Sequence, residues 1–183
     1  MTAQILHQLK HTMVLVGMMG AGKTAVGSAV ARALAVPFVD SDEEIVRAAQ
    51  MSVAEIFARD GETFFRARES EVLQRLMTGA PCVLSTGGGA FLAPQNRAMI
   101  AAHGVSVWLQ ADLELLWNRV RHKTTRPLLR TADPKATLRG LLEARAPIYA
   151  LADVKVEAEP DLSVDAMAAK VIDALRAHGD LVE

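Results

Sequence analysis

The sequence has little cysteine, few aromatic side chains and no excess of charge of either sign. Of its 183 residues, 4% are aromatic, and 20 lysines and arginines are balanced by 21 aspartates and glutamates. This balance argues against a general binder of nucleic acids or membrane surfaces. The only cysteine, Cys82, cannot form an intrachain disulfide. It lies in the apolar run Pro81–Leu84, which favours a small buried side chain over a nucleophile.

Long apolar runs are also missing. No stretch approaches the ~20 apolar residues that a membrane-spanning helix needs, and residues 1–10 have no signal-peptide layout. We therefore expect a cytoplasmic protein. Because 51% of the residues are hydrophobic and the length suits one domain, we expect residues 1–183 to fold as a single domain around a sizeable core.

A glycine-rich octet provides the clearest chemical signal. Residues 17–24 read Gly-Met-Met-Gly-Ala-Gly-Lys-Thr and fit the P-loop pattern G-x-x-x-x-G-K-[ST]. Glycines let successive backbone N–H groups point at one anion, while Lys23 can reach the β- and γ-phosphates and the Thr24 hydroxyl can ligate Mg²⁺. An apolar strand-like run precedes the octet and an alanine-rich helical pattern follows it. This context favours a phosphate site at a helix N-terminus over a plain glycine-rich turn.

Strand-like and helix-like segments alternate along the chain, which predicts an α/β fold with a parallel sheet covered on both faces. The predicted strands are residues 12–16, 37–40, 82–85, 105–109 and 154–157. The predicted helices are residues 23–35, 42–49, 52–59, 62–77, 94–102, 112–121, 134–149 and 163–178. Two segments do not fit the alternation: residues 85–92, with three consecutive glycines, and the polar, basic residues 122–133.

Two aspartates, Asp40 and Asp42, follow the second predicted strand. Open α/β sheets bind ligands at the carboxyl ends of their strands. Beside a P-loop, an aspartate at such a place can hold Mg²⁺ through water or orient a nucleophile. The alternative is that one of the pair only caps the helix that begins near Glu43. The neighbouring P-loop favours a functional role for at least one of them.

Arg66 and Glu69 are three residues apart on a predicted helix and therefore share a face. From this spacing alone, a weak surface ion pair is favoured over a guanidinium that binds a carboxylate. Further along, Gly87–Gly89 ends the third predicted strand. These glycines either allow a close approach of backbone N–H groups to a ligand or form a flexible turn, and the spacing does not decide between the two.

Residues 119–130 contain five basic side chains: Arg119, Arg121, Lys123, Arg126 and Arg130. Beside a nucleotide site, such a segment can close over phosphates and exclude water. The alternatives are a solvated run of charges and a weak contact with nucleic acid. Because no aromatic residues are interleaved with these cations, binding to single-stranded nucleic acid is disfavoured.

In their order along the chain, these features resemble the shikimate kinase family over nearly the whole sequence. The matching residues are Gly17–Thr24, Asp40–Asp42, Phe65–Glu69, Gly87–Gly89, Arg126–Leu129 and Arg145–Tyr149. The P-loop alone is common to many families, whereas the ordered set of six is specific. The resemblance implies transfer of the γ-phosphoryl group of ATP to the 3-hydroxyl of shikimate, a step of chorismate and aromatic amino-acid biosynthesis.

On the acceptor side, the resemblance implies a role for several of these residues. Asp42 is implied to hold the attacking hydroxyl, as its base or as an orienting group. Arg66 and Arg145 are implied to clamp the substrate carboxylate, with Glu69 steadying the arginines. Gly88 is implied to donate a backbone hydrogen bond to the substrate. The resemblance therefore favours a functional Arg66 over the surface ion pair.

On the nucleotide side, the resemblance implies that Arg126 reaches the transferring phosphate, which makes it catalytic together with Asp42 and Lys23. Arg119 is implied to pack on adenine. The Mg²⁺ ion that accompanies ATP would be held by Thr24 and, through water, by Asp40. The residues expected to bind ATP are Gly20, Ala21, Gly22, Lys23, Thr24, Ala25, Arg119 and Arg126.

The resemblance also implies the nucleoside-monophosphate-kinase type of P-loop fold. This is a three-layer fold with a five-stranded parallel sheet, a substrate-binding helical region near residues 42–70 and a lid near residues 119–133. Two departures stand out. Ala25 stands where many relatives carry a second hydroxyl, so we expect the loss of one hydrogen bond to the α-phosphate, a net loss of about 1 kcal/mol. The lid segment of residues 122–125 is short and lacks glycine, so the sequence leaves open how far the lid closes.

Two other functions fit part of the pattern. A different kinase on the same scaffold, such as a gluconate or nucleoside-monophosphate kinase, would share the P-loop. The two arginines and the triple glycine favour a carboxylated polyol over a nucleotide as acceptor. A non-catalytic ATP-binding protein is disfavoured because Lys23, Thr24, Asp40 and Asp42 are all present. The expected partners are ATP and shikimate, with no nucleic acid and no membrane, and the default state is a monomer.

Overall fold

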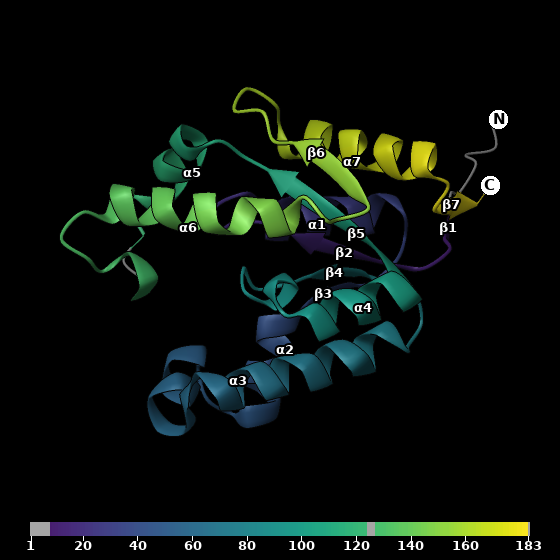
Figure 1. The fold of residues 1–183 in the computed structure, drawn as a ribbon. Helices are drawn as coiled ribbons and strands as arrows, with labels where there is room; N and C mark the ends of the chain where they lie inside the picture. The colour runs from purple at the N-terminus through teal and green to yellow at the C-terminus, as the bar shows by residue number, and fades with distance from the viewer. Residues whose placement is uncertain (1–7, 124–126, 183) are drawn as a thin grey trace.

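A five-stranded parallel sheet forms the centre of the computed structural model, which describes residues 8–123 and 127–182 (Figure 1). The strand order is β3-β4-β2-β5-β6. The strands are β2 (Thr12–Val16), β3 (Phe38–Asp40), β4 (Val83–Ser85), β5 (Gly104–Gln110) and β6 (Val154–Glu157). All four pairings are parallel, with Leu15 of β2 opposite Ser85 of β4. The predicted parallel sheet is confirmed.

The central strand is apolar along its whole length. All five residues of β2 are buried, and Met13, Val14 and Leu15 have no exposed surface. A parallel strand with helices above and below has no solvent-facing side, so it reads as a continuous apolar run. The edge strand β6 instead alternates buried and exposed residues, as a strand covered less completely should.

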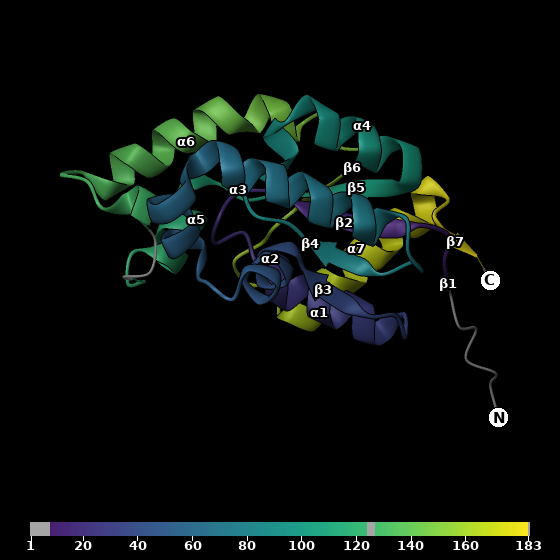
Figure 2. The same cartoon turned by 90° about the horizontal axis from the view of Figure 1, so that it is seen from below.

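Helices cover both faces of this sheet and complete three layers (Figure 2). One face carries α1 (Lys23–Ala33) and α7 (Val164–His178), which pack against each other. The opposite face carries α4 (Pro94–His103) and α6 (Pro134–Tyr149), and α5 (Leu113–Val120) packs against α6. The predicted three-layer α/β fold is therefore confirmed.

Two further helices lie beyond the β3 edge of the sheet: α2 (Ser41–Ala49) and α3 (Val53–Met77) (Figure 1). They share a small apolar core of their own, built from Ile45, Ile56 and Phe65, which is distinct from the core under the sheet. Among the described residues, no helix has both the length and the hydropathy to cross a membrane. The role of residues 42–70 in binding substrate and the extent of the single domain stay predictions.

The bounds of β2, β6 and α6 agree with the predicted ones, and the other predicted elements differ by one or two residues at an end, except in α3. The two helices predicted over residues 52–59 and 62–77 are joined in α3, with one non-helical residue between them. That residue is Gly61, at φ 85° and ψ 171°. The predicted break is confirmed: it is a kink at one glycine, and the residues on either side of it are helical.

Four short elements were not predicted. The strands β1 (Gln8–Leu9) and β7 (Leu181–Val182) form an antiparallel pair that joins the two ends of the described chain. Two 3₁₀ turns are also present, η1 (Ala90–Leu92) and η2 (Pro127–Leu129). Elements of two or three residues are too short to show a period in the sequence, and tertiary contacts decide whether they form.

We predict that Gly61→Ala lowers the free energy of unfolding by about 1–3 kcal/mol, because residues with a Cβ rarely adopt this backbone conformation. No atom outside the neighbouring residues lies within 4 Å of a Cβ at this position, so the cost is one of backbone conformation alone. Gly140→Ala is the matched control: Gly140 is exposed within α6 and has equally open surroundings. That change should raise stability by about 0.5–1 kcal/mol.

Urea denaturation of both variants measures the two effects. A Gly61→Ala variant as stable as Gly140→Ala would contradict the non-helical break in α3.

Candidate active site

A cavity of about 550 Å³ opens at the carboxyl ends of the parallel strands. Loops after β2, β3, β4 and β6 all contribute to its wall, as expected when parallel strands end at one edge of a sheet. The lining residues that were predicted to bind ligands are Gly20, Ala21, Gly22, Lys23, Thr24, Ala25, Asp40, Asp42, Gly88 and Arg119. The structure thus brings together segments from five separate parts of the chain.

The P-loop connects β2 to α1, and three of its glycines have a positive φ, Gly17 at 142° among them. Gly20 has φ 81° and Gly22, which caps α1, has φ 99°. A Cβ at Gly20 would lie 2.7 Å from Val120 Cγ1, so the loop packs closely against α5. Lys23 Nζ donates to the carbonyl oxygens of Gly17 at 2.8 Å and Met18 at 3.0 Å. These bonds hold the ammonium group over the loop, beside the N-terminus of α1.

Arg119 contacts the same loop from α5. Its Nη1 donates to the carbonyl oxygens of Gly20 and Ala21, both at 3.0 Å. The sequence resemblance gave Arg119 a role at adenine, whereas the contacts in the structure are to the P-loop backbone. The guanidinium nevertheless lines the cavity, so a flat base could stack on it while these bonds persist.

One wall of the cavity is apolar and was not predicted from the sequence. Ala158, Leu162, Val164 and Met167 line it from the segment after β6 and from the start of α7. A flat, largely apolar base needs such a wall. Scattered apolar residues carry no motif, so nothing in the sequence distinguished these four from ordinary core residues.

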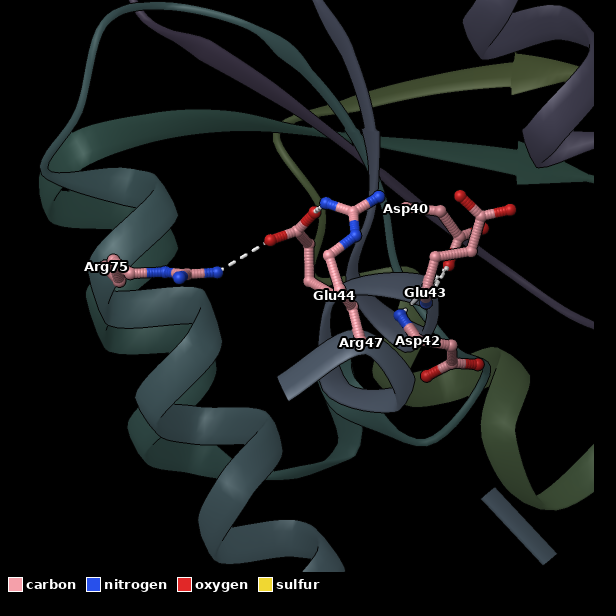
Figure 3. A network of polar contacts seen from close by, with 6 residues as sticks. All are labelled: Asp40, Asp42, Glu43, Glu44, Arg47 and Arg75. Atoms are coloured by element: carbon pink, nitrogen blue, oxygen red, sulfur yellow. Dashed lines mark hydrogen bonds and ion pairs between the residues drawn. The ribbon is translucent and has the colours of Figure 1, made fainter. Parts of the chain in front are cut away.

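Asp40 begins α2 as its cap. Its Oδ1 accepts the backbone N–H groups of Asp42 at 2.9 Å and Glu43 at 3.2 Å (Figure 3). The capping role considered from the sequence is therefore confirmed for Asp40. Asp40 and Asp42 both line the cavity. Because the cap bonds the N–H of Asp42, it also restrains the backbone from which the Asp42 side chain extends.

The rest of α2 is held to α3 by a shared carboxylate. Glu44 accepts Arg47 Nη1 at 2.5 Å and Arg75 Nη2 at 2.7 Å, and Arg75 lies near the far end of α3 (Figure 3). Exposed ion pairs contribute little energy each, so most of the contact between these helices comes from their apolar core. Of the two pairs, Glu44–Arg75 joins α2 to α3, whereas Glu44–Arg47 lies within α2.

The triple glycine after β4 touches three charged side chains from three helices. A Cβ at Gly87 would lie 3.0 Å from Asp42 Oδ1, and one at Gly88 would lie 3.0 Å from Arg145 Nη1. A Cβ at Gly89 would lie 2.5 Å from Arg66 Nη1. The three glycines therefore allow a close approach of side chains from three helices, and the predicted acceptor residues meet there. The predicted approach of backbone N–H groups to a ligand stays a prediction.

The spacing alone had favoured a surface ion pair between Arg66 and Glu69. In the structure this pair is instead partly buried. Arg66 Nη1 donates to Glu69 Oε1 at 2.9 Å, and Glu69 is only 1% exposed. Burial raises the pKa of the Glu69 carboxyl, the positive charge of Arg66 opposes this rise, and the Asp42 carboxylate adds to it. The buried Glu69 carboxyl thus orients Arg66, while about a third of the arginine side chain stays exposed.

A second buried group, which the sequence did not single out, links α3 to the turn after the glycines. Ser70 Oγ donates to Asn96 Oδ1 at 2.8 Å, and Asn96 Nδ2 donates to the carbonyl of Ala90 at 2.9 Å. Asn96 is 1% exposed. A buried amide with both ends bonded resists rotation, so it holds the helix that carries Arg66 in register with the glycine loop.

The residues available to a metal suit Mg²⁺ bound together with phosphates. Thr24 and Asp40 both line the cavity beside the P-loop. Within residues 8–123 and 127–182, no group of three or more His, Cys, Asp or Glu side chains forms a complete metal site. Mg²⁺ commonly uses one or two protein oxygens with water and substrate phosphates, and this donor set fits that pattern.

One predicted catalytic residue, Arg126, lies outside the described residues. Of the lid predicted near residues 119–133, the structure describes the end of α5 and the turn η2. Lys123, between them, lines the cavity.

The sequence is similar to those of shikimate kinases over most of its length. The shikimate kinase family model matches residues 19–176. A shikimate kinase of Cereibacter sphaeroides is 64% identical over 98% of this chain and 90% of its own length. One from Ruegeria pomeroyi is 65% identical over 96% of this chain and 90% of its own length.

Solved structures give the same result. A shikimate kinase from Acinetobacter baumannii in complex with shikimate has a TM-score of 0.87 at 36% identity, with 92% of this chain and 94% of that chain covered. A gluconokinase from Sinorhizobium meliloti 1021, covering 93% and 94%, reaches a TM-score of 0.60 at 20% identity and shares the fold alone. By its sequence, its fold and the family model, the chain belongs to the shikimate kinase family.

Proposed function

We propose that the cavity and its rim transfer the γ-phosphoryl group of ATP to the 3-hydroxyl of shikimate, forming shikimate 3-phosphate and ADP. The observation that carries this proposal is the meeting of Asp42, Arg145 and Arg66 at Gly87–Gly89, next to a P-loop. Two guanidinium groups suit a carboxylate, and a carboxylate suits a hydroxyl. The reaction is a step of aromatic amino-acid biosynthesis.

The phosphate side of the proposal rests on the P-loop. Its backbone N–H groups and the ammonium of Lys23 are to bind the β- and γ-phosphates. Lys23 would exchange its contacts with Gly17 and Met18 for phosphate oxygens, since its Nζ already lies over the loop. Arg119 and the apolar wall are to enclose adenine. The role of Arg126 at the transferring phosphate stays a prediction.

The acceptor side rests on the glycine loop. Arg66 and Arg145 are to bind the carboxylate of shikimate, and the Gly88 N–H is to bind a substrate oxygen. Asp42 is to hold the attacking hydroxyl in line with the γ-phosphorus and to receive its proton. Phosphoryl transfer depends mainly on alignment and neutralisation of charge, which this set of residues can supply.

Mg²⁺ is proposed as the cofactor, with Thr24 as a direct ligand and Asp40 as a ligand through water. When bound with ATP, the ion neutralises charge on the β- and γ-phosphates. The near balance of acidic and basic residues supports the absence of a nucleic-acid or membrane partner. A monomer in the cytoplasm that binds ATP and shikimate completes the proposal. Light scattering coupled to size exclusion measures the oligomeric state.

An ATP-consumption screen with shikimate, quinate, gluconate and AMP tests the function. We expect turnover with shikimate that exceeds turnover with each of the other three, because only shikimate should satisfy both the arginines and Asp42. A preference for gluconate would replace this function with that of another carboxylated-polyol kinase.

We predict that Asp42→Asn lowers kcat with shikimate by roughly 10²–10⁴-fold, since the change keeps the shape but removes nearly all basicity. Asp40→Asn is the matched control, because asparagine caps helices as well as aspartate does and α2 should remain intact. Its main effect should be a higher Mg²⁺ requirement. Steady-state kinetics over a range of Mg²⁺ concentrations separates the two, and the opposite pattern would show that the roles of the aspartates are exchanged.

We predict that Arg66→Lys raises KM for shikimate by roughly ten- to a hundredfold and changes KM for ATP little. Lysine keeps the charge but lacks the planar fork, and a hydrogen bond to a charged group is worth about 1.5–3 kcal/mol. Arg68→Lys, on the same helix, is the control: Arg68 is half exposed and pairs with Glu71, so both KM values should stay unchanged. Equal rises in both KM values for Arg66→Lys would indicate a structural role.

A further inference from the structure

Tyr149, the only tyrosine of the chain, stands completely buried at the end of α6. Its ring lies against that of Trp108, with the ring centroids 6.1 Å apart. Its hydroxyl donates to the carbonyl oxygen of Gly88 at 2.5 Å, across 61 residues of sequence. A buried phenol that donates its single O–H to one backbone carbonyl restrains the position of that peptide group.

Arg145 lies one helical turn earlier than Tyr149 on the same face of α6. Its positive charge favours the ionised form of the phenol and so lowers the pKa of Tyr149 against the effect of burial. A Cβ at Gly88 would lie 3.0 Å from Arg145 Nη1 and 3.5 Å from the Tyr149 hydroxyl, so the three groups form one cluster. A phenol that donates one hydrogen bond, as Tyr149 does to Gly88, can still accept another from a neighbouring guanidinium.

The phenol of Tyr149 is in its neutral, protonated form. Burial raises the pKa of Tyr149 above its ordinary value of 10.0, although the positive charges of Arg145 and Arg66 oppose the rise. The hydroxyl therefore remains a donor to Gly88 at all pH values at which the protein would work.

Within the glycine loop, the carbonyl of Gly88 is the one that a distant residue restrains. The carbonyl of Gly87 accepts the N–H of Ala90 at 3.2 Å, and that of Gly89 accepts the N–H of Leu92 at 3.1 Å. Both are local turn contacts, whereas the carbonyl between them is held by Tyr149. Glycine has the largest conformational freedom to lose, so a run of three requires external contacts to keep one conformation.

We propose that Tyr149 is a positioning residue for the acceptor substrate: its hydroxyl sets the orientation of Arg145 and of the Gly88 peptide together. This inference rests on the proposed function, in which Arg145 binds the carboxylate of shikimate and Gly88 donates to the substrate. Tyr149 itself acts through these two groups. Its counterpart on the other arginine is Glu69, which orients Arg66.

Tyr149→Phe tests the proposal, because phenylalanine keeps the ring against Trp108 and removes only the hydroxyl. We expect KM for shikimate to rise about tenfold or more, with kcat changed less than about threefold and KM for ATP unchanged. A role limited to stability would instead lower the active fraction, so that kcat falls and both KM values stay the same. That result would overturn the proposal.

A double-mutant cycle identifies the partner through which the hydroxyl acts. In an Arg145→Lys background, Tyr149→Phe should change KM for shikimate far less than it does in the wild type, since the orientation it provides is already lost. In an Arg66→Lys background, the effect of Tyr149→Phe should keep its full size. Equal effects in both backgrounds would contradict a specific action on Arg145.

A measurement on the unmutated chain covers the case in which Tyr149→Phe fails to fold. Labelling with 3-fluorotyrosine gives a single ¹⁹F resonance, because the chain has one tyrosine. Saturating shikimate should shift this resonance, whereas ATP should leave it nearly unchanged; no shift with shikimate would overturn the proposal. An unmutated enzyme that does not phosphorylate shikimate would refute the proposed function instead, so the two failures are distinguishable.

Discussion

The absence of side chains at Gly87–Gly89 is the constraint on which the candidate active site depends. Three charged groups approach this loop from three helices: Asp42 from α2, Arg145 from α6 and Arg66 from α3. A Cβ at any of the three glycines would lie at 3.0 Å or less from one of these groups. Because the loop has no side chains, helices that are far apart in sequence can direct their charges to one small volume.

Sheet topology then sets this loop beside the phosphate loop. β4 pairs with β2, so the segments that follow the two strands emerge next to each other at the carboxyl edge. One segment is the P-loop and the other is the triple glycine. Donor and acceptor halves of a phosphoryl transfer thus become neighbours through strand order, without being near each other in the sequence.

The two arginines are oriented by different kinds of partner. Arg66 is paired with Glu69, a buried carboxylate, so much of its charge is already balanced. Arg145 and the neutral phenol of Tyr149 both lie against Gly88, and in the proposed arrangement the phenol orients the guanidinium without balancing its charge. Fixing both side chains in advance reduces the entropy lost when a carboxylate binds.

Local patterns in the sequence determined the P-loop, the alternation of strands and helices, and the break at Gly61, since each depends on contiguous residues. They also identified Asp42, Arg66 and Gly88 once the order of the motifs was recognised. Only the tertiary structure decided that Glu69 is buried, that Asn96 and Tyr149 hold the glycine loop, and which apolar residues line the cavity. Burial and long-range hydrogen bonds depend on which segments meet in space, and neither residue type nor spacing records that.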